Sequence, residues 1–106
     1  MKILLLLLLI SNTCLAGTSF KKKSDAIYTA TGTSTQVISR DLDRKYLLIQ
    51  NQGTDIVIIN LASAQSGGNG IQIPAGGFWE PLVCPYDSIF IKALSGTQAV
   101  EILEGK

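Results

Sequence analysis

The sequence predicts an all-β protein: a small β-sandwich or jelly-roll of seven to eight short antiparallel strands that follows an apolar N-terminal segment. Short runs of β-branched and aromatic residues recur at roughly ten-residue spacing, with glycine-containing turn sequences between them. No stretch carries the sustained hydrophobic period of an amphipathic helix. The expected strands lie at residues 26–31, 35–39, 45–50, 55–60, 71–73, 88–93 and 98–103.

The first two expected strands are short. Residues 26–31 (AIYTAT) are rich in residues that favour β-structure, and Gly32 ends the run. Residues 35–39 (TQVIS) follow after a brief turn.

Residues 45–50 (KYLLIQ) and 55–60 (DIVIIN) give the most marked strand signal in the chain. The apolar run inside the first of them indicates a strand that is covered on both faces. Between the two lies NQGT, in which Gly53 can adopt the positive φ angle that closes a tight turn. We therefore expect these two strands to form a β-hairpin.

The strand at residues 71–73 leads into a corner, IPAGGFWEP, at residues 73–81. Its glycines permit a sharp change of chain direction. Phe78 and Trp79 are adjacent, so in an extended segment their rings point to opposite faces. We expect Trp79 to face outward, beside Glu80, because a buried indole N–H needs a partner.

Two further strands are expected near the C-terminus. Residues 88–93 (SIFIKA) and 98–103 (QAVEIL) are both rich in apolar residues, and the turn sequence SGT at residues 95–97 lies between them.

The chain divides into residues 1–16, a signal peptide or apolar N-terminal arm, residues 17–25, a basic linker, and residues 26–106, a single β-sandwich domain. Lys2 precedes an apolar run that is shorter than the about 20 residues needed to span a bilayer. A small-x-small sequence at residues 14–16 favours a cleaved signal peptide, and a retained arm is the alternative. The run consists of Ile3, Leu4, Leu5, Leu6, Leu7, Leu8, Leu9 and Ile10.

The charge balance argues against nucleic-acid binding. The chain has nine Lys and Arg residues and eight Asp and Glu residues, so it lacks the basic footprint of a nucleic-acid-binding protein. The local exception is Lys21, Lys22 and Lys23, for which a solvated linker is the simplest interpretation. A contact with nucleic acid or phospholipid headgroups is the alternative.

The residues needed for common catalytic chemistry are missing. The chain has no histidine, which excludes Ser-His-Asp and Cys-His systems. Cys14 and Cys84 cannot build a structural zinc site, and Cys84 is expected to be a small buried residue. Asp41 and Asp43 are the nearest carboxylate pair, but the mixed charges of residues 40–45 (RDLDRK) indicate a solvated loop with self-paired charges. We expect no enzymatic activity, no cofactor and no metal site.

Residues 44–54 (RKYLLIQNQGT) resemble the R-x-Y/L-L-L-I-Q-N-x-G/S-T opening of small bacteriophage virion proteins. Residues 74–80 (PAGGFWE) resemble the P-G-G-x-x-E turn that follows in that group, and Glu104-Gly105 resembles its C-terminal Glu-Gly. The resemblance covers residues 40–105. It implies a non-enzymatic structural part of a phage particle, namely a decoration, spike or minor capsid protein, with no catalytic residues to carry over.

The resemblance also implies a location in the virion, with other capsid or virion proteins as partners and with self-association as a trimer or pentamer. A small domain without an internal disulfide gains independently from burying surface between subunits. An uncleaved N-terminal arm could add contact with a neighbouring subunit or a membrane. The expected contact residues are Phe78, Trp79, Glu80 and Tyr86.

The alternative function is an exported bacterial β-sandwich that binds a cell surface or a glycan. It would be secreted or periplasmic after removal of the signal peptide. Its aromatic platform would consist of Trp79, Tyr86, Tyr46 and Phe78. Its polar partners would be Glu80, Asn69 and Gln72.

Overall fold

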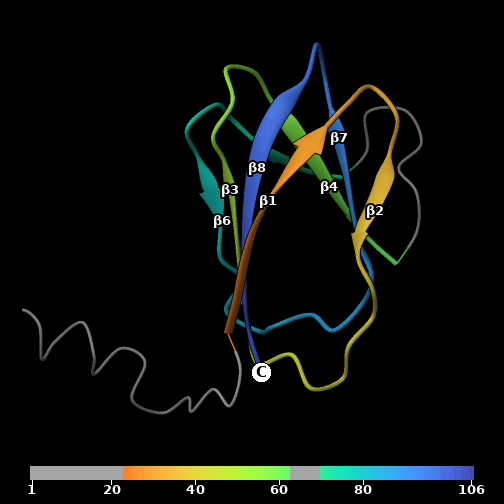
Figure 1. The fold of residues 1–106 in the computed structure, drawn as a ribbon, viewed down its shortest axis with the longest axis vertical. Coiled ribbons are helices and arrows are strands. Elements are labelled where there is room, and N and C mark those ends of the chain that lie inside the picture. Colours follow the sequence, from red (N-terminus) through yellow and green to blue (C-terminus); the bar gives the residue numbers. More distant parts are fainter. Residues whose placement is uncertain (1–22, 63–69) are drawn as a thin grey trace, which may run out of the picture.

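The computed structural model describes residues 23–62 and 70–106. Within these ranges the chain forms strands and turns and no helix, and therefore no helix that could cross a membrane (Figure 1). The eight strands are β1 (Lys23–Ala30), β2 (Thr35–Ile38), β3 (Tyr46–Asn51), β4 (Val57–Leu61), β5 (Ile71–Ile73), β6 (Phe78–Trp79), β7 (Ile89–Ala93) and β8 (Gln98–Gly105). The expected all-β class is confirmed.

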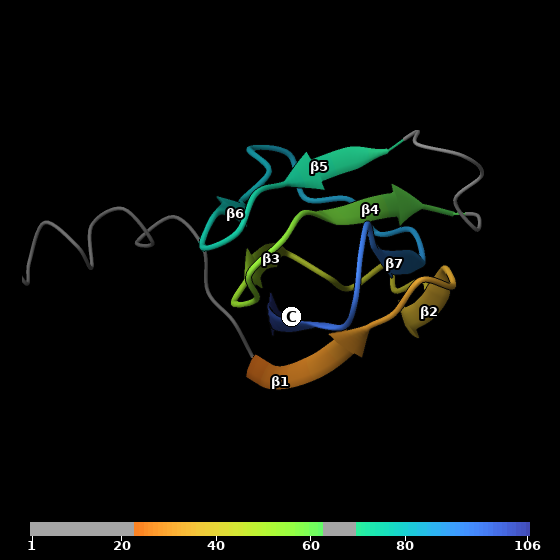
Figure 2. The ribbon, with the colours of Figure 1, turned by 90° about the horizontal axis from the view of Figure 1, so that it is seen from above.

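The strands pair in a nested order: β1 with β8, β2 with β7, β3 with β6, and β4 with β5, all antiparallel. Pairs β3–β8 and β4–β7 join them into sheet A, in the order β1-β8-β3-β6, and sheet B, in the order β2-β7-β4-β5. Figure 2 shows the two sheets as separate layers. Eight antiparallel strands nested in this way form a jelly-roll.

The hydrophobic core lies between the two sheets and is built mainly from aliphatic side chains. In β3 burial alternates along the strand, so that Leu47 and Ile49 face the core while Leu48 lies half-buried on the other side. The core residues are Ala30, Ile38, Leu47, Ile49, Val57, Ile59, Ile73, Ile89, Ile91, Ala93, Val100 and Ile102.

The expected hairpin between residues 45–50 and 55–60 is wrong. Strands β3 and β4 belong to different sheets. The connection crosses between the sheets, and Asn51 holds the crossing: its Nδ2 donates to Asp55 O at 2.7 Å and to Ile73 O at 2.9 Å. Gly53 has no positive φ angle. A Cβ at Gly53 would lie 2.0 Å from Gln98 Oε1 and 2.9 Å from Gln98 Cβ, so any larger residue would displace the buried Gln98 side chain.

The corner at residues 73–81 carries the chain from β5 in sheet B to β6 in sheet A, and Gly76 adopts a φ of 74° in the turn. The expectation that Trp79 faces outward is wrong. Trp79 lies opposite the fully buried Ile49 and packs against the core, whereas Phe78 lies opposite Gln50 and is 65% exposed. Side chains of directly paired residues share a face of the sheet, so the register places Trp79 inside.

Strand β1 begins at Lys23, three residues before the expected start of the domain. Lys23 is paired with Gly105 of β8 and therefore belongs to sheet A, not to a linker. Lys21, Lys22 and the apolar run at residues 3–10 lie outside the described residues.

Candidate functional site

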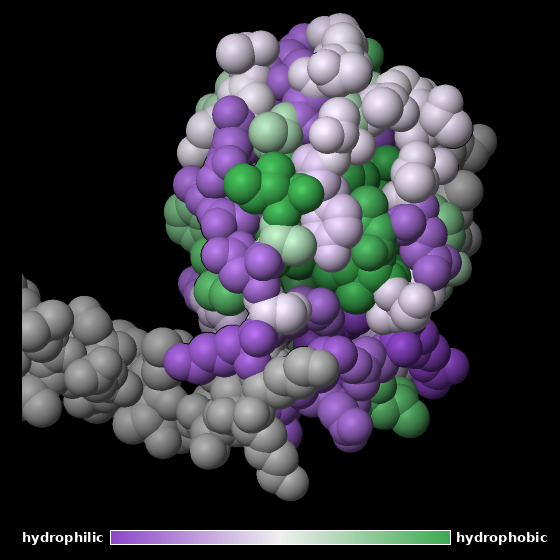
Figure 3. Space-filling view, viewed as in Figure 1, coloured by the Kyte–Doolittle hydropathy of each residue, from purple (hydrophilic) through white to green (hydrophobic). Residues whose placement is uncertain are grey.

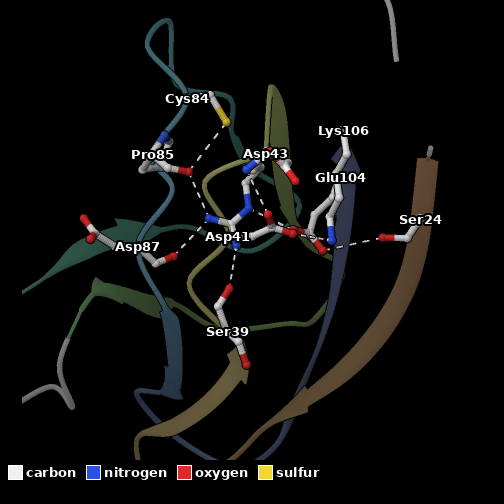
Figure 4. Close-up of polar contacts among 10 residues, drawn as sticks. Ser24, Ser39, Asp41, Asp43, Cys84, Pro85, Asp87, Glu104 and Lys106 are labelled. Carbon is white, nitrogen blue, oxygen red and sulfur yellow. Dashed lines mark hydrogen bonds and ion pairs between the residues drawn. The ribbon is translucent and has the colours of Figure 1, made fainter. Parts of the chain in front are cut away.

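Arg44 is the centre of a buried polar cluster. Figure 4 labels its partners Ser39, Pro85, Asp87 and Glu104 beside the C-terminal residue Lys106, at the end of the sandwich where the C-terminus lies. The Nε of Arg44 donates to Glu104 Oε2 at 2.8 Å. Its Nη1 donates to the carbonyl oxygens of Pro85 and Asp87, and its Nη2 to that of Ser39, each at 2.9 Å. The guanidinium thereby ties the end of β2, the segment before β7 and the end of β8 to one another.

Residues 40–45 form a largely exposed loop, as expected, but the expectation that its charges pair with one another is wrong. Arg44 is only 4% exposed, and its charge partner is Glu104 of β8 rather than a neighbouring carboxylate. Asp41 forms an ion pair with Lys106. The hydrogen bond from Lys106 holds the pKa of Asp41 below its ordinary value, and the Asp43 N–H that bonds Asp41 Oδ1 acts in the same direction.

Two loops fixed by this cluster carry exposed apolar side chains. The segment between β6 and β7 presents Leu82, Val83 and Tyr86, which are 102%, 83% and 47% exposed. The segment between β2 and β3 presents Leu42, which is 69% exposed. The backbone N–H of Asp41 donates to Tyr86 O at 2.9 Å and joins the two loops. We call these four apolar side chains the end surface.

Tyr86 has a second function in holding the loops together. The guanidinium carbon of Arg40 lies 5.5 Å from the centre of the Tyr86 ring, within the range of a cation–π contact. One face of the ring therefore meets a cation from the neighbouring loop, while the side chain as a whole remains exposed. Tyr86 is the predicted contact residue that the structure places on the end surface.

The other predicted contact residues lie on or beside β6. Phe78 projects from the outer face of sheet A, and Trp79 packs inward. Glu80 accepts a hydrogen bond from the Tyr46 hydroxyl across the sheet. Partial burial, together with this bond, raises the pKa of Tyr46 to about 12. The aromatic platform expected for a glycan-binding module is therefore divided, and Asn69 lies outside the described residues.

Asn51 and Gln98 are buried polar residues that sequence reasoning did not identify. Asn51 Oδ1 accepts the Gly53 N–H at 2.9 Å, and Gln98 Oε1 accepts the Thr54 N–H at 2.7 Å. Both side chains form hydrogen bonds with backbone groups where the chain passes from one sheet to the other. Such bonds are needed because buried backbone N–H and C=O groups must have partners. In the sequence, the position of Asn51 at the end of the apolar strand LLIQN was the available signal for a buried polar residue.

The described residues offer few groups for chemistry. Among residues 23–62 and 70–106, no three His, Cys, Asp or Glu side chains gather in a way that would hold a metal ion. Cys84 is half-buried against the core, and burial raises the pKa of its thiol. A raised pKa keeps the thiol protonated and poorly nucleophilic.

Comparison with known proteins identifies no family. No protein-family model matches the chain, and no curated protein matches it. Among solved structures, a chain of the Bacillus endospore appendages, which are disulfide-linked pili, is 19% identical, with a TM-score of 0.46 and coverage of 79% of this chain and 85% of that chain. A protein from Neisseria meningitidis known from its crystal structure is 10% identical, with a TM-score of 0.46 and coverage of 90% and 95%. Likenesses at this level carry no argument about function.

Proposed function

We propose that this chain is a non-enzymatic structural component of a bacteriophage virion: a minor capsid, decoration or spike protein. The observation that carries the proposal is the end surface, where Leu82 and Val83 are almost fully exposed on a loop whose backbone is fixed by the buried Arg44. Exposed apolar side chains on a loop that buried hydrogen bonds hold in place suit a surface that binds another macromolecule. The rigid support lowers the entropy lost when the partner binds.

The residues that carry the resemblance to phage virion proteins have structural roles in this chain. Arg44 of the first motif pairs with Glu104 of the last, and Asn51 holds the crossing between the sheets. Gly76 of the second motif adopts a positive φ angle in the corner. Motifs whose residues stabilise the jelly-roll suit a structural protein.

The proposed partners are other copies of this chain and other capsid or virion proteins, with the end surface and Phe78 as contacts. Jelly-rolls occur in capsid proteins but also in lectins, so the fold alone does not separate the two functions. The division of the aromatic platform weakens the glycan-binding alternative, because Trp79 packs against the core. We propose no catalytic activity and no cofactor. In a virion protein, residues 1–16 would be retained as an arm that contacts a neighbouring subunit or a membrane.

The test is quantitative mass spectrometry of particles purified by density gradient from the phage or strain that carries this gene. We expect the chain to sediment with the major capsid protein in a fixed ratio, with peptides that contain Met1 or Lys2. The proposal would be contradicted if the chain occurred only in the particle-free fraction and began at Gly17. That result would favour the exported module. A glycan array with the purified chain, and with Tyr86→Ala as the variant, would then examine that alternative.

A further inference from the structure

The two sheets end in four edge strands, β1 and β6 in sheet A, and β2 and β5 in sheet B. Edge strands expose unpaired backbone groups that can pair with another chain, and proteins usually block them. Strand β2 has four residues and an irregular register between Gln36 and Ile38. Strand β5 has three residues and is followed by Pro74. Strand β6 has two residues and is followed by Glu80 and Pro81.

Strand β1 has none of these blocks. It is eight residues long and pairs with β8 in continuous register from Lys23↔Gly105 to Ala30↔Gln98. It contains no proline, and its charged residues, Lys23 and Asp25, stand at its N-terminal end. Within the described part of the chain, β8 is the one strand paired with β1. Figure 3 shows apolar surface over β1 and beside it, towards β2.

We propose that two copies of this chain pair antiparallel through the free edges of β1, about a two-fold axis at Ile27. This pairing joins sheet A of both copies into one continuous sheet. The inference rests on β1 alone and holds whether or not the chain belongs to a virion. It favours a two-fold contact over the trimer or pentamer expected from the resemblance.

The distribution of charge along β1 fits an antiparallel pair of identical strands. With Ile27 on the axis, Asp25 lies opposite the partner's Thr29, and Lys23 lies opposite the partner's Thr31. A parallel pair in register would instead place Lys23 and Asp25 directly against their own copies, and like charges in opposed positions destabilise a sheet. The strand is therefore self-complementary only in the antiparallel direction.

The sizes of the side chains fit the same register. Ala26 lies opposite the buried Ile102 and therefore points to the inner face, yet it is exposed. Tyr28 lies opposite Val100 on that same face and is half-buried. With the axis at Ile27, Ala26 lies opposite the partner's Tyr28, so that a large ring covers a small residue twice in each dimer. On the outer face the two Ile27 side chains, each 64% exposed, meet at the axis.

Disulfide trapping tests both the contact and its register. In a Cys14→Ser, Cys84→Ala background, the full chain with Ile27→Cys should form a covalent dimer on mild oxidation, because residues at the axis have Cα atoms about 4.5–5.5 Å apart, within disulfide range. Thr29→Cys is the matched control on the same strand and face. Its two copies would lie roughly 14 Å apart, because they are offset by four residues at about 3.4 Å per residue. Equal trapping of both variants, or of neither, would overturn the proposal.

A mass measurement in solution gives an independent test. Purified full chain should show a concentration-dependent dimer by light scattering, and Ile27→Lys should weaken it by roughly tenfold or more, because it places like charges opposite each other. Leu94→Lys is the matched control, because Leu94 is 53% exposed and follows β7, away from strand β1 and from the proposed contact residues. A mass unchanged by Ile27→Lys, or reduced equally by both variants, would overturn the pairing through β1.

Discussion

Arg44 and Glu104 lie 60 positions apart in the chain and form a buried ion pair, with 2.8 Å between Nε and Oε2. Glu104 lies in β8, directly opposite Leu47 of β3, and its Oε1 also accepts a hydrogen bond from Ser24 of β1 at 3.5 Å. The Glu104 carboxylate thus links β8 to β1 through Ser24, and to the loops that carry the end surface through Arg44.

Removal of one partner from this pair should destabilise the fold severely. Arg44→Met leaves the Glu104 carboxylate without its charge partner, and loss of one member of a buried pair costs about 3–5 kcal/mol. The double variant Arg44→Met, Glu104→Leu should recover a large part of that loss in urea unfolding. A double variant no more stable than Arg44→Met would show that the bonds to the loop carbonyls, rather than the ion pair, dominate.

Trp79 and Phe78 should differ sharply in their effect on stability. Trp79→Ala removes a ring packed against the core and should cost about 2–3 kcal/mol, somewhat less than for a fully buried aromatic residue. Phe78→Ala removes an exposed ring and should change the free energy of unfolding by less than about 0.5 kcal/mol. Iodide quenching of the single tryptophan provides a direct check, because a Trp79 that faces the core should be poorly quenched in the native state.

Asn51 should tolerate little change. Its side chain is fully buried and its Nδ2 donates to two backbone carbonyls. Asn51→Asp replaces both donated bonds with repulsion between oxygens, and each buried group left unsatisfied costs about 1–3 kcal/mol. We expect a loss of at least about 3 kcal/mol at neutral pH, with partial recovery in acid as the new carboxyl protonates. An equal loss of stability at neutral and at acidic pH would contradict this explanation.

Tyr46 should give the protein a distinct alkaline titration. Its pKa is raised to about 12 in the folded state, whereas an unperturbed tyrosine titrates near 10. Between these values the folded chain retains a proton that the unfolded chain has lost, so stability should fall as the pH rises through this range. Absorbance of tyrosinate should show a late phase near pH 12 that disappears in Tyr46→Phe.

The strand pattern could be predicted from the sequence because burial follows the local alternation of apolar residues. Seven of the eight strands fall on expected segments, while β6 was hidden in the corner as only two residues, Phe78 and Trp79. The assignment of strands to sheets was not accessible in the same way. NQGT at the end of β3 has the composition of a hairpin turn, but β3 pairs with β8 and β4 with β7 in the other sheet, and Asn51 bonds to Asp55 and Ile73 at the crossing.

The candidate site was harder to predict than the fold for a related reason. Arg44 stands among charged residues that read as a solvated loop, and its partner, Glu104, becomes its neighbour only through the pairing of β3 with β8. The outward or inward direction of Trp79 depends on its register with Ile49, which periodicity within a two-residue strand cannot specify. Contacts between distant segments decided both cases.

The most direct test of the central claim, that the end surface attaches this chain to a particle, is the number of copies bound per particle. Leu82→Lys with Val83→Lys should leave the fold intact, because both side chains are exposed, and should reduce the bound copies by at least about tenfold through the loss of apolar contact. Leu94→Lys serves as the control and should bind at the wild-type level, because Leu94 is exposed and lies between β7 and β8, whose connection is at the end of the sandwich away from the C-terminus (Figure 1). Wild-type occupancy by the double variant would contradict the claim.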